Sequence, residues 1–206
     1  MRALLLIDIQ NDFCPGGSLA VERGDEVVSV ANGLAARFDF VVATQDWHSA
    51  DHASFASSHV GHSVGDVIEL GSVSQVLWPD HCVQNRPGAS FHSGLDVAAI
   101  DVVVRKGSDP AIDSYSGFFD NGHLRDTGLA AILRDRAVSE VWIAGLATDY
   151  CVKYTALDAR DLGFVVTVVA DGCRAVDLSR GDGQRALDEM RAAGCVVRRS
   201  LGADAG

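Results

Sequence analysis

Three residues of the sequence carry the side chains that nucleophilic amide chemistry needs, namely Asp8, Lys106 and Cys151. We expect Cys151 in the first turn of a helix that follows a strand, where unpaired backbone N–H groups favour a thiolate. The Lys106 ammonium would lower the thiol pKa further, and Asp8 could accept the thiol proton and pass it to a leaving amine. A buried structural cysteine, with Asp8 as a strand-end cap and Lys106 in solvent, remains the alternative.

A second group of residues has the composition of a metal site. Asp46 and His48 are two apart, so in extended backbone their side chains point to the same side, and His52 follows four residues later. His81 could complete the set. Mixed carboxylate and imidazole ligation suits Zn, Fe(II) and Mn. Surface loops also collect histidine without binding a metal, so that alternative stays open.

Aromatic side chains lie near both groups in the sequence. Phe13 is close to Asp8, and Trp47 and Trp78 are close to the candidate metal ligands. Such residues either wall a pocket for an aromatic ligand or fill the core. Filling the core is the favoured interpretation for Trp47.

Six apolar runs of strand length and four helical patterns follow one another along the chain. The strand candidates are residues 2–9, 38–44, 101–106, 140–146, 164–170 and 195–199. The helical patterns are residues 24–37, 124–136, 149–162 and 180–193, with Gly163 and Gly194 as helix caps. The order predicts the α/β class, a three-layer doubly wound sandwich with a mostly parallel six-stranded sheet. Ligands of such sheets bind beyond the carboxyl ends of the strands, where the residues above converge.

The segment between the second and third strand candidates breaks this alternation. Residues 45–99 contain no clear regular element but hold six of the seven histidines. Long irregular loops are uncommon in compact domains unless they are functional. We therefore expect one domain over residues 1–206 with a metal-binding loop insertion at about 45–100, and a frayed tail at 202–206.

Composition and charge exclude several classes of protein. Seventeen Lys and Arg against 28 Asp and Glu give a net charge of −11, which disfavours nucleic-acid and membrane partners. The apolar run at the N-terminus is too short for a signal peptide or a membrane span, so we expect a cytoplasmic protein. Five cysteines, an odd number, do not indicate a disulfide framework.

Four blocks of sequence, in order, resemble the bacterial nicotinamidase/pyrazinamidase family of the isochorismatase-like cysteine hydrolase superfamily. The blocks are residues 1–19, 43–56, 78–84 and 145–152, with shorter matches at 105–107 and 115–118 between them. The resemblance covers nearly the whole chain. It implies an amidohydrolase that converts nicotinamide, and pyrazinamide as a close isostere, to the acid and ammonia through a cysteine thioester in NAD salvage.

The resemblance also implies roles for individual residues. It implies a catalytic triad with Cys151 as nucleophile, Asp8 as proton shuttle and Lys106 as the third member. One divalent metal ion, with Zn favoured over Fe and Mn, would be held by Asp46, His48, His52 and His81. The backbone N–H groups of Ala147 and Cys151 would form an oxyanion hole after a cis peptide between Leu146 and Ala147. Substrate contacts would come from Phe13, Trp78, Leu146 and Tyr115.

Some features are left open by the resemblance. Tyr150, next to the nucleophile, stands where some relatives carry His, and residues 55–77, with His59 and His62, match least. A homo-oligomer is not decided. The alternatives are another hydrolase of the superfamily, acting on a different small amide or a vinyl ether, and a non-catalytic α/β ligand-binding module. The intact set of metal-ligand candidates argues against the metal-free hydrolases.

Overall fold

A six-stranded, wholly parallel sheet forms the centre of the molecule. The computed structural model describes residues 1–71 and 73–200, and the strand order is β5-β2-β1-β6-β7-β8. The strands are β1 (Arg2–Ile7), β2 (Val41–Asp46), β5 (Val102–Lys106), β6 (Glu140–Leu146), β7 (Val165–Arg174) and β8 (Val196–Arg198). Each overlaps one of the predicted runs, so the predicted sheet is confirmed.

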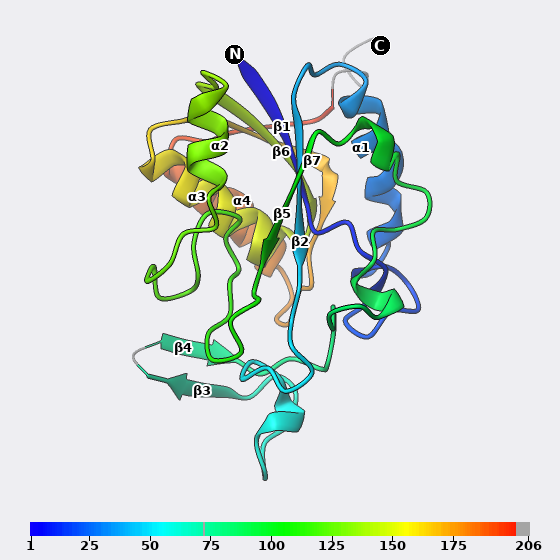
Figure 1. Ribbon diagram of the computed structural model, residues 1–206, viewed down its shortest axis with the longest axis vertical. Helices are drawn as coiled ribbons and strands as arrows, with labels where there is room; N and C mark the ends of the chain where they lie inside the picture. The colour runs from blue at the N-terminus through cyan, green and yellow to red at the C-terminus, as the bar shows by residue number, and fades with distance from the viewer. Residues whose placement is uncertain (72, 201–206) are drawn as a thin grey trace.

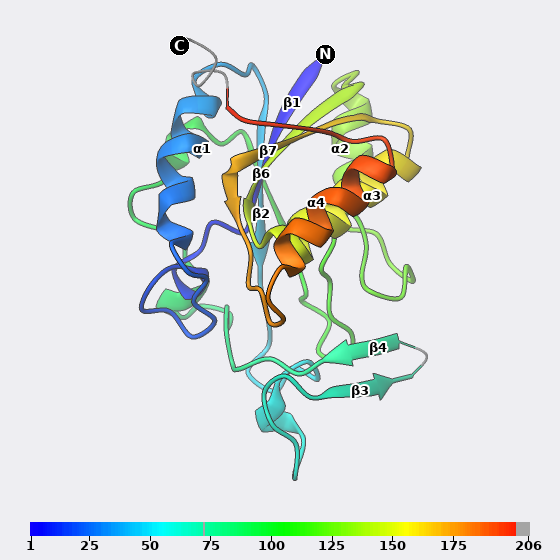
Figure 2. The same cartoon turned by 180° about the vertical axis from the view of Figure 1, so that it is seen from behind.

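Helices cover both faces of this sheet. They are α1 (Val27–Ala35), α2 (Leu129–Asp135), α3 (Lys153–Asp161) and α4 (Asp182–Ala192). Helix α1 lies on one face, and α2, α3 and α4 lie on the other (Figures 1 and 2). Side chains of β1 alternate between the layers, since Leu4 and Leu6 pack with α1 while Leu5 and Ile7 pack with the other helices. The three-layer α/β sandwich is confirmed.

The helix boundaries differ from the prediction mainly at α2. The helical pattern begins at residue 124, but the Asp120 carboxylate accepts hydrogen bonds from the backbone N–H groups of Leu124 and Arg125 and holds them in a turn. The helix begins only after Gly128, whose φ is +85°. The predicted caps Gly163 and Gly194 have φ values of +90° and +85° and end α3 and α4 as expected.

The expectation of an irregular segment at 45–99 is wrong in part. Strands β3 (Val67–Leu70) and β4 (Val73–Val76) form an antiparallel hairpin there. The hairpin projects from the molecule at the end toward which β2 points (Figure 1). Its residues are mostly exposed or half-buried, so they lack the continuous hydrophobicity that marks the central strands.

Two remaining expectations concern the ends of the chain and membranes. No helix in the described part of the chain is long and apolar enough to cross a membrane. The predicted frayed tail at 202–206 lies outside the described residues.

Candidate active site

The predicted reactive side chains meet at the carboxyl end of the sheet. Asp8 follows β1, while Asp46 and Lys106 are the last residues of the neighbouring strands β2 and β5 and are paired in register. Cys151 follows β6 in a turn of π-helix, Thr148–Val152, that leads into α3. One oxygen of Asp8, one of Asp46 and the Cys151 sulfur lie within 4.8 Å of one another. The predicted convergence is confirmed.

Lys106 is the centre of this cluster. Its Nζ donates hydrogen bonds to Asp46 Oδ1 at 2.7 Å and to the Ser114 carbonyl at 2.8 Å, and it lies 3.4 Å from Cys151 Sγ. It also forms an ion pair with Asp8 Oδ2 at 2.9 Å. Burial lowers the pKa of Lys106, but the carboxylates of Asp46 and Asp8 outweigh it and raise the pKa well above its ordinary value. The alternative that places Lys106 in solvent is wrong, because its side chain is fully buried.

Asp8 is held so that one oxygen stays available to Lys106 and the thiol. Thr44 Oγ1 donates to Asp8 Oδ1 at 2.7 Å and accepts the Asp8 backbone N–H at 3.2 Å. Burial raises the pKa of Asp8, and Lys106 opposes this rise only in part. A carboxylate with a raised pKa is a stronger base than an ordinary one, as acceptance of a thiol proton requires.

The Cys151 thiol does not have the depressed pKa that we expected from its helix position. Burial raises its pKa well above the ordinary value; Lys106 lowers it, and the carboxylates of Asp8 and Asp46 raise it again. That expectation is wrong for the ligand-free chain, because two anions and burial outweigh one cation. The thiol must therefore give up its proton during the reaction.

The peptide bond between Leu146 and Ala147 is cis, as the resemblance implies. Ala147 and Cys151 both line the adjacent pocket, whereas Leu146 is fully buried and packs with the α1 side of the core. The structure thus places the two residues of the implied oxyanion hole at the pocket. It does not place the Leu146 side chain there.

An aromatic pocket lies next to the cluster and shares Asp46 and Cys151 with it. It is lined by Phe13, Leu19, Asp46, Trp78, His81, Asp113, Tyr115, Ala147, Tyr150, Cys151 and Val176. Phe13, Trp78 and Tyr115, which the resemblance assigns to substrate, are all among these residues. Trp47 is not, and its ring instead stacks under the Arg105 guanidinium, which lies 3.9 Å from the ring centroid.

Three of the four candidate metal ligands come together beside this pocket. Asp46, His48 and His81 each offer one ligand atom within 4.8 Å of the others. His48 Nδ1 lies 2.8 Å from the Gly107 carbonyl and His81 Nδ1 2.8 Å from the Pro79 carbonyl. A carbonyl oxygen only accepts, so in each neutral ring the Nε2 lone pair is free for a metal. The buried Nε2 atoms of His48 and His52 have no hydrogen-bond partner among the described residues, which fits metal ligation.

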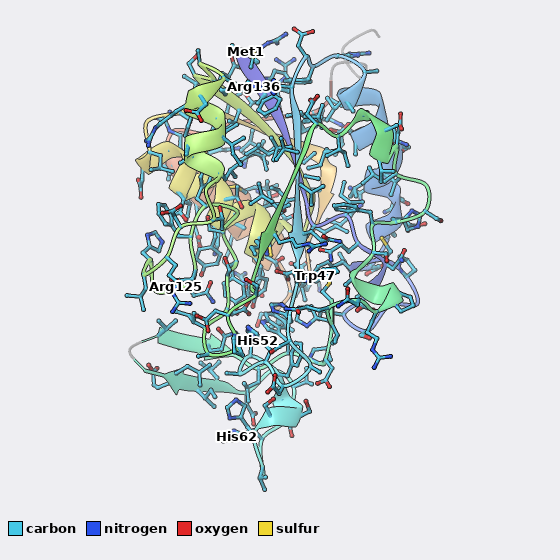
Figure 3. All side chains as sticks on the ribbon, in the orientation of Figure 1. Met1, Trp47, His52, His62, Arg125 and Arg136 are labelled. Carbon is cyan, nitrogen blue, oxygen red and sulfur yellow. The ribbon has the colours of Figure 1, made fainter. Side chains whose placement is uncertain are left out.

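His52 lies outside this group. Its ring is 4.3 Å from the His48 ring, centroid to centroid, and is fully buried. The Ser54 backbone N–H lies 3.2 Å from His52 Nδ1 and Ser54 Oγ lies 2.8 Å from it, so either tautomer of the ring has a partner there. With the proton on Nδ1, the buried Nε2 is available to a metal, so His52 stays a predicted ligand. His59 and His62 are not part of the group. His59 Nε2 lies 2.7 Å from the Ala53 carbonyl, and His62, which lies well below His52 in Figure 3, is 3.3 Å from Asp66 Oδ2.

Two buried residues of the site escaped the sequence reasoning. Asp113 lines the pocket, and its Oδ1 lies 3.9 Å from His48 Nε2. The Gln10 carboxamide accepts the backbone N–H of Asp46 at 2.8 Å and donates to its carbonyl at 2.9 Å. The position of Gln10, two residues beyond Asp8, was the only signal for it, while Asp113 lies in a loop with no periodic pattern.

A fully buried Lys–Asp–Cys cluster beneath an aromatic pocket, with a carboxylate–imidazole group beside it, defines a cysteine hydrolase of the doubly wound α/β class. The isochorismatase domain model matches residues 2–200, and the chain belongs to this family. Nicotinamidase of Escherichia coli strain K12 is 51% identical over 200 residues, covering 95% of this chain and 93% of that one.

Solved structures agree with this assignment. A nicotinamidase and pyrazinamidase of Acinetobacter baumannii superposes with a TM-score of 0.94 at 43% identity, over 97% of this chain and 96% of that one. Pyrazinamidase of Pyrococcus horikoshii, solved in complex with zinc, has a TM-score of 0.78 at 37% identity, over 96% of this chain and 98% of that one.

Proposed function

We propose that this chain hydrolyses nicotinamide, and pyrazinamide as its isostere, to the corresponding acid and ammonia through a thioester on Cys151. The observation that carries the proposal is the position of Lys106 Nζ, which contacts Asp8, Asp46 and Cys151 at the floor of an aromatic pocket. The names of the similar proteins support the choice of substrate.

The first half of the reaction forms the thioester. Asp8 takes the proton from Cys151 as the sulfur attacks the carboxamide carbon, and Lys106 compensates the negative charge of the cluster. The carbonyl oxygen becomes an oxyanion, to which the backbone N–H groups of Ala147 and Cys151 donate. Asp8 then gives its proton to the amide nitrogen, the C–N bond breaks, and ammonia leaves.

The second half returns the enzyme to its starting state. Asp8 takes a proton from a water molecule whose oxygen attacks the thioester carbon. The C–S bond breaks, the carboxylic acid leaves, and Asp8 returns the proton to the Cys151 sulfur. Burial raises the pKa of both Asp8 and Cys151, which favours the protonated form of each group when it receives the proton.

Asp46, His48, His52 and His81 would hold one divalent metal ion, and we propose zinc. The ion would supply a Lewis-acid contact for the pyridine nitrogen and so orient the ring. Phe13 and Trp78 line the same pocket and would enclose the ring.

An ammonia-release assay tests the proposal. The purified protein, loaded with zinc, is offered nicotinamide, pyrazinamide and a vinyl ether substrate of isochorismate type. Ammonia from both amides supports the proposal. Turnover of the vinyl ether alone would assign another reaction of the superfamily, and the absence of turnover together with binding of nicotinamide would assign a non-catalytic module.

Several further statements rest on the sequence and stay predictions. These are a single domain over residues 1–206, a role in NAD salvage, a cytoplasmic location and the absence of nucleic-acid and membrane partners.

A further inference from the structure

A second hollow lies next to the catalytic pocket. This groove runs between the β3–β4 hairpin and the helices α3 and α4. It is lined by Val67, Ser74, Val76, Tyr115, Asp149, Tyr150, Lys153, Tyr154, Asp182, Arg185 and Glu189. Two residues, Tyr115 and Tyr150, line both the pocket and the groove. These two side chains form the wall between the pocket and the groove.

The two tyrosines of this wall are held in different ways. Tyr115 Oη accepts hydrogen bonds from Trp78 Nε1 at 3.0 Å and from Gln75 Nε2 at 2.9 Å. In residues 1–71 and 73–200 no hydrogen bond to the Tyr150 hydroxyl is found, and its ring is placed by edge contacts with Trp78 and Tyr115, at centroid distances of 4.8 and 5.3 Å. Tyr150 can therefore be shortened without leaving a buried donor unpaired, whereas Tyr115 cannot.

The groove can take an uncharged group. Its basic side chains are already paired, Lys153 with Glu189 at 3.1 Å and Arg185 with Asp182. Val67, Val76 and the half-exposed ring of Tyr154 supply apolar surface near Tyr150. An aryl substituent on the substrate would match this surface better than a charged one.

We propose that Tyr150 is a specificity-determining residue, whose ring closes the catalytic pocket against the groove and so excludes ring-substituted nicotinamides. This rests on the proposed function. With the pyridine nitrogen at the metal ligands and the carboxamide at Cys151, ring carbon 5 faces neither group, so a substituent there must meet another wall of the pocket. Removal of the Tyr150 ring joins pocket and groove and admits it.

The test compares nicotinamide with 5-phenylnicotinamide in wild type, Tyr150→Ala and Tyr150→Leu. Nicotinamide turnover by wild type tests the proposed function separately. For 5-phenylnicotinamide we expect the ratio of its kcat/KM to that of nicotinamide to rise by about 10²-fold in both variants, the scale at which pocket size discriminates between apolar groups. The inhibition constant of 5-phenylnicotinate against nicotinamide hydrolysis should fall in the same variants. This inhibitor is not hydrolysed, so it measures whether the phenyl group fits the pocket independently of turnover.

Matched variants locate the effect. Tyr150→Phe keeps the ring and should still reject the phenyl substrate, as should Tyr154→Ala, which widens the groove without opening the wall. Val176→Ala opens the pocket at a residue that does not line the groove, and it should not admit the substrate. Rejection by both folded Tyr150 variants, equal gain from Val176→Ala, or ready hydrolysis of 5-phenylnicotinamide by wild type would each overturn the proposal.

Discussion

The Asp46 carboxylate joins the metal-ligand group to Lys106. Its Oδ1 accepts a hydrogen bond from Lys106 Nζ at 2.7 Å, and its Oδ2 lies 3.4 Å from His48 Nε2. Burial raises the pKa of Asp46, but Lys106 and His48 outweigh it and hold the pKa well below its ordinary value. One side chain therefore serves both the candidate metal centre and the catalytic cluster.

Replacement of Asp46 should consequently act on the thiol as well as on metal binding. In chelator-treated protein, Asp46→Asn should raise the rate of Cys151 alkylation by iodoacetamide at fixed pH. The reason is that Asp46 raises the pKa of Cys151, so loss of its charge lowers that pKa and increases the thiolate fraction. His48→Ala is the control and should leave the alkylation rate unchanged. Equal rates of Cys151 alkylation in Asp46→Asn and His48→Ala would show that the Asp46 charge does not act on the thiol. Peptide mapping distinguishes Cys151 from the other cysteines.

Asp8→Asn should separate thiol reactivity from turnover. An amide cannot shuttle a proton, so nicotinamide turnover should fall by about 10²- to 10⁴-fold. Alkylation of Cys151 should become faster, because the Asp8 charge raises the pKa of the thiol. In the double variant Asp8→Asn with Cys151→Ala, the loss of activity should equal that of the more damaging single variant, because the two side chains act as one catalytic unit. Independent, multiplying losses would argue for separate roles.

The metal ion should matter for the ring nitrogen of the substrate. Benzamide has the same shape and carboxamide but no ring nitrogen, and its kcat/KM should be lower by about 10² to 10⁴ with the metal bound. Chelation or His48→Ala should reduce nicotinamide hydrolysis toward the benzamide level. If zinc-loaded protein hydrolyses both amides equally fast, the ion is structural and a different amide becomes the better candidate.

Gln10 should control metal affinity without contacting the metal. Its side chain fixes the backbone of Asp46 on both sides, at the N–H and at the carbonyl. Gln10→Met keeps the volume but removes these bonds, and zinc affinity should fall by about 10- to 100-fold, as is typical for groups that orient a ligand. Competition with a chromogenic chelator measures this. Retained affinity would show that Asp46 is positioned by Lys106 alone.

Sequence reasoning predicted the sheet because the central strands are buried on both faces and read as continuous apolar runs. Asp8, Lys106 and Cys151 could be placed at one edge because parallel strands share their carboxyl ends. The β3–β4 hairpin was missed because its short strands are half-exposed.

Within the metal group, spacing placed Asp46 and His48 on one side of an extended strand, and His52 and His81 were the further candidates. His81 Nδ1 faces the Pro79 carbonyl and His52 Nδ1 faces Ser54, details that only the folded loops determine. Asp113 was missed for the same reason.

Trapping of the acyl-enzyme tests the central claim most directly. Zinc-loaded wild type and Cys151→Ala are mixed with nicotinamide, quenched with acid during turnover, and examined by intact-mass and peptide mass spectrometry alongside an ammonia assay. The account predicts a nicotinoyl group on the Cys151 peptide of wild type, and neither adduct nor ammonia from a folded Cys151→Ala. Ammonia release by Cys151→Ala at a rate near that of wild type, with no adduct on wild-type Cys151, would contradict it.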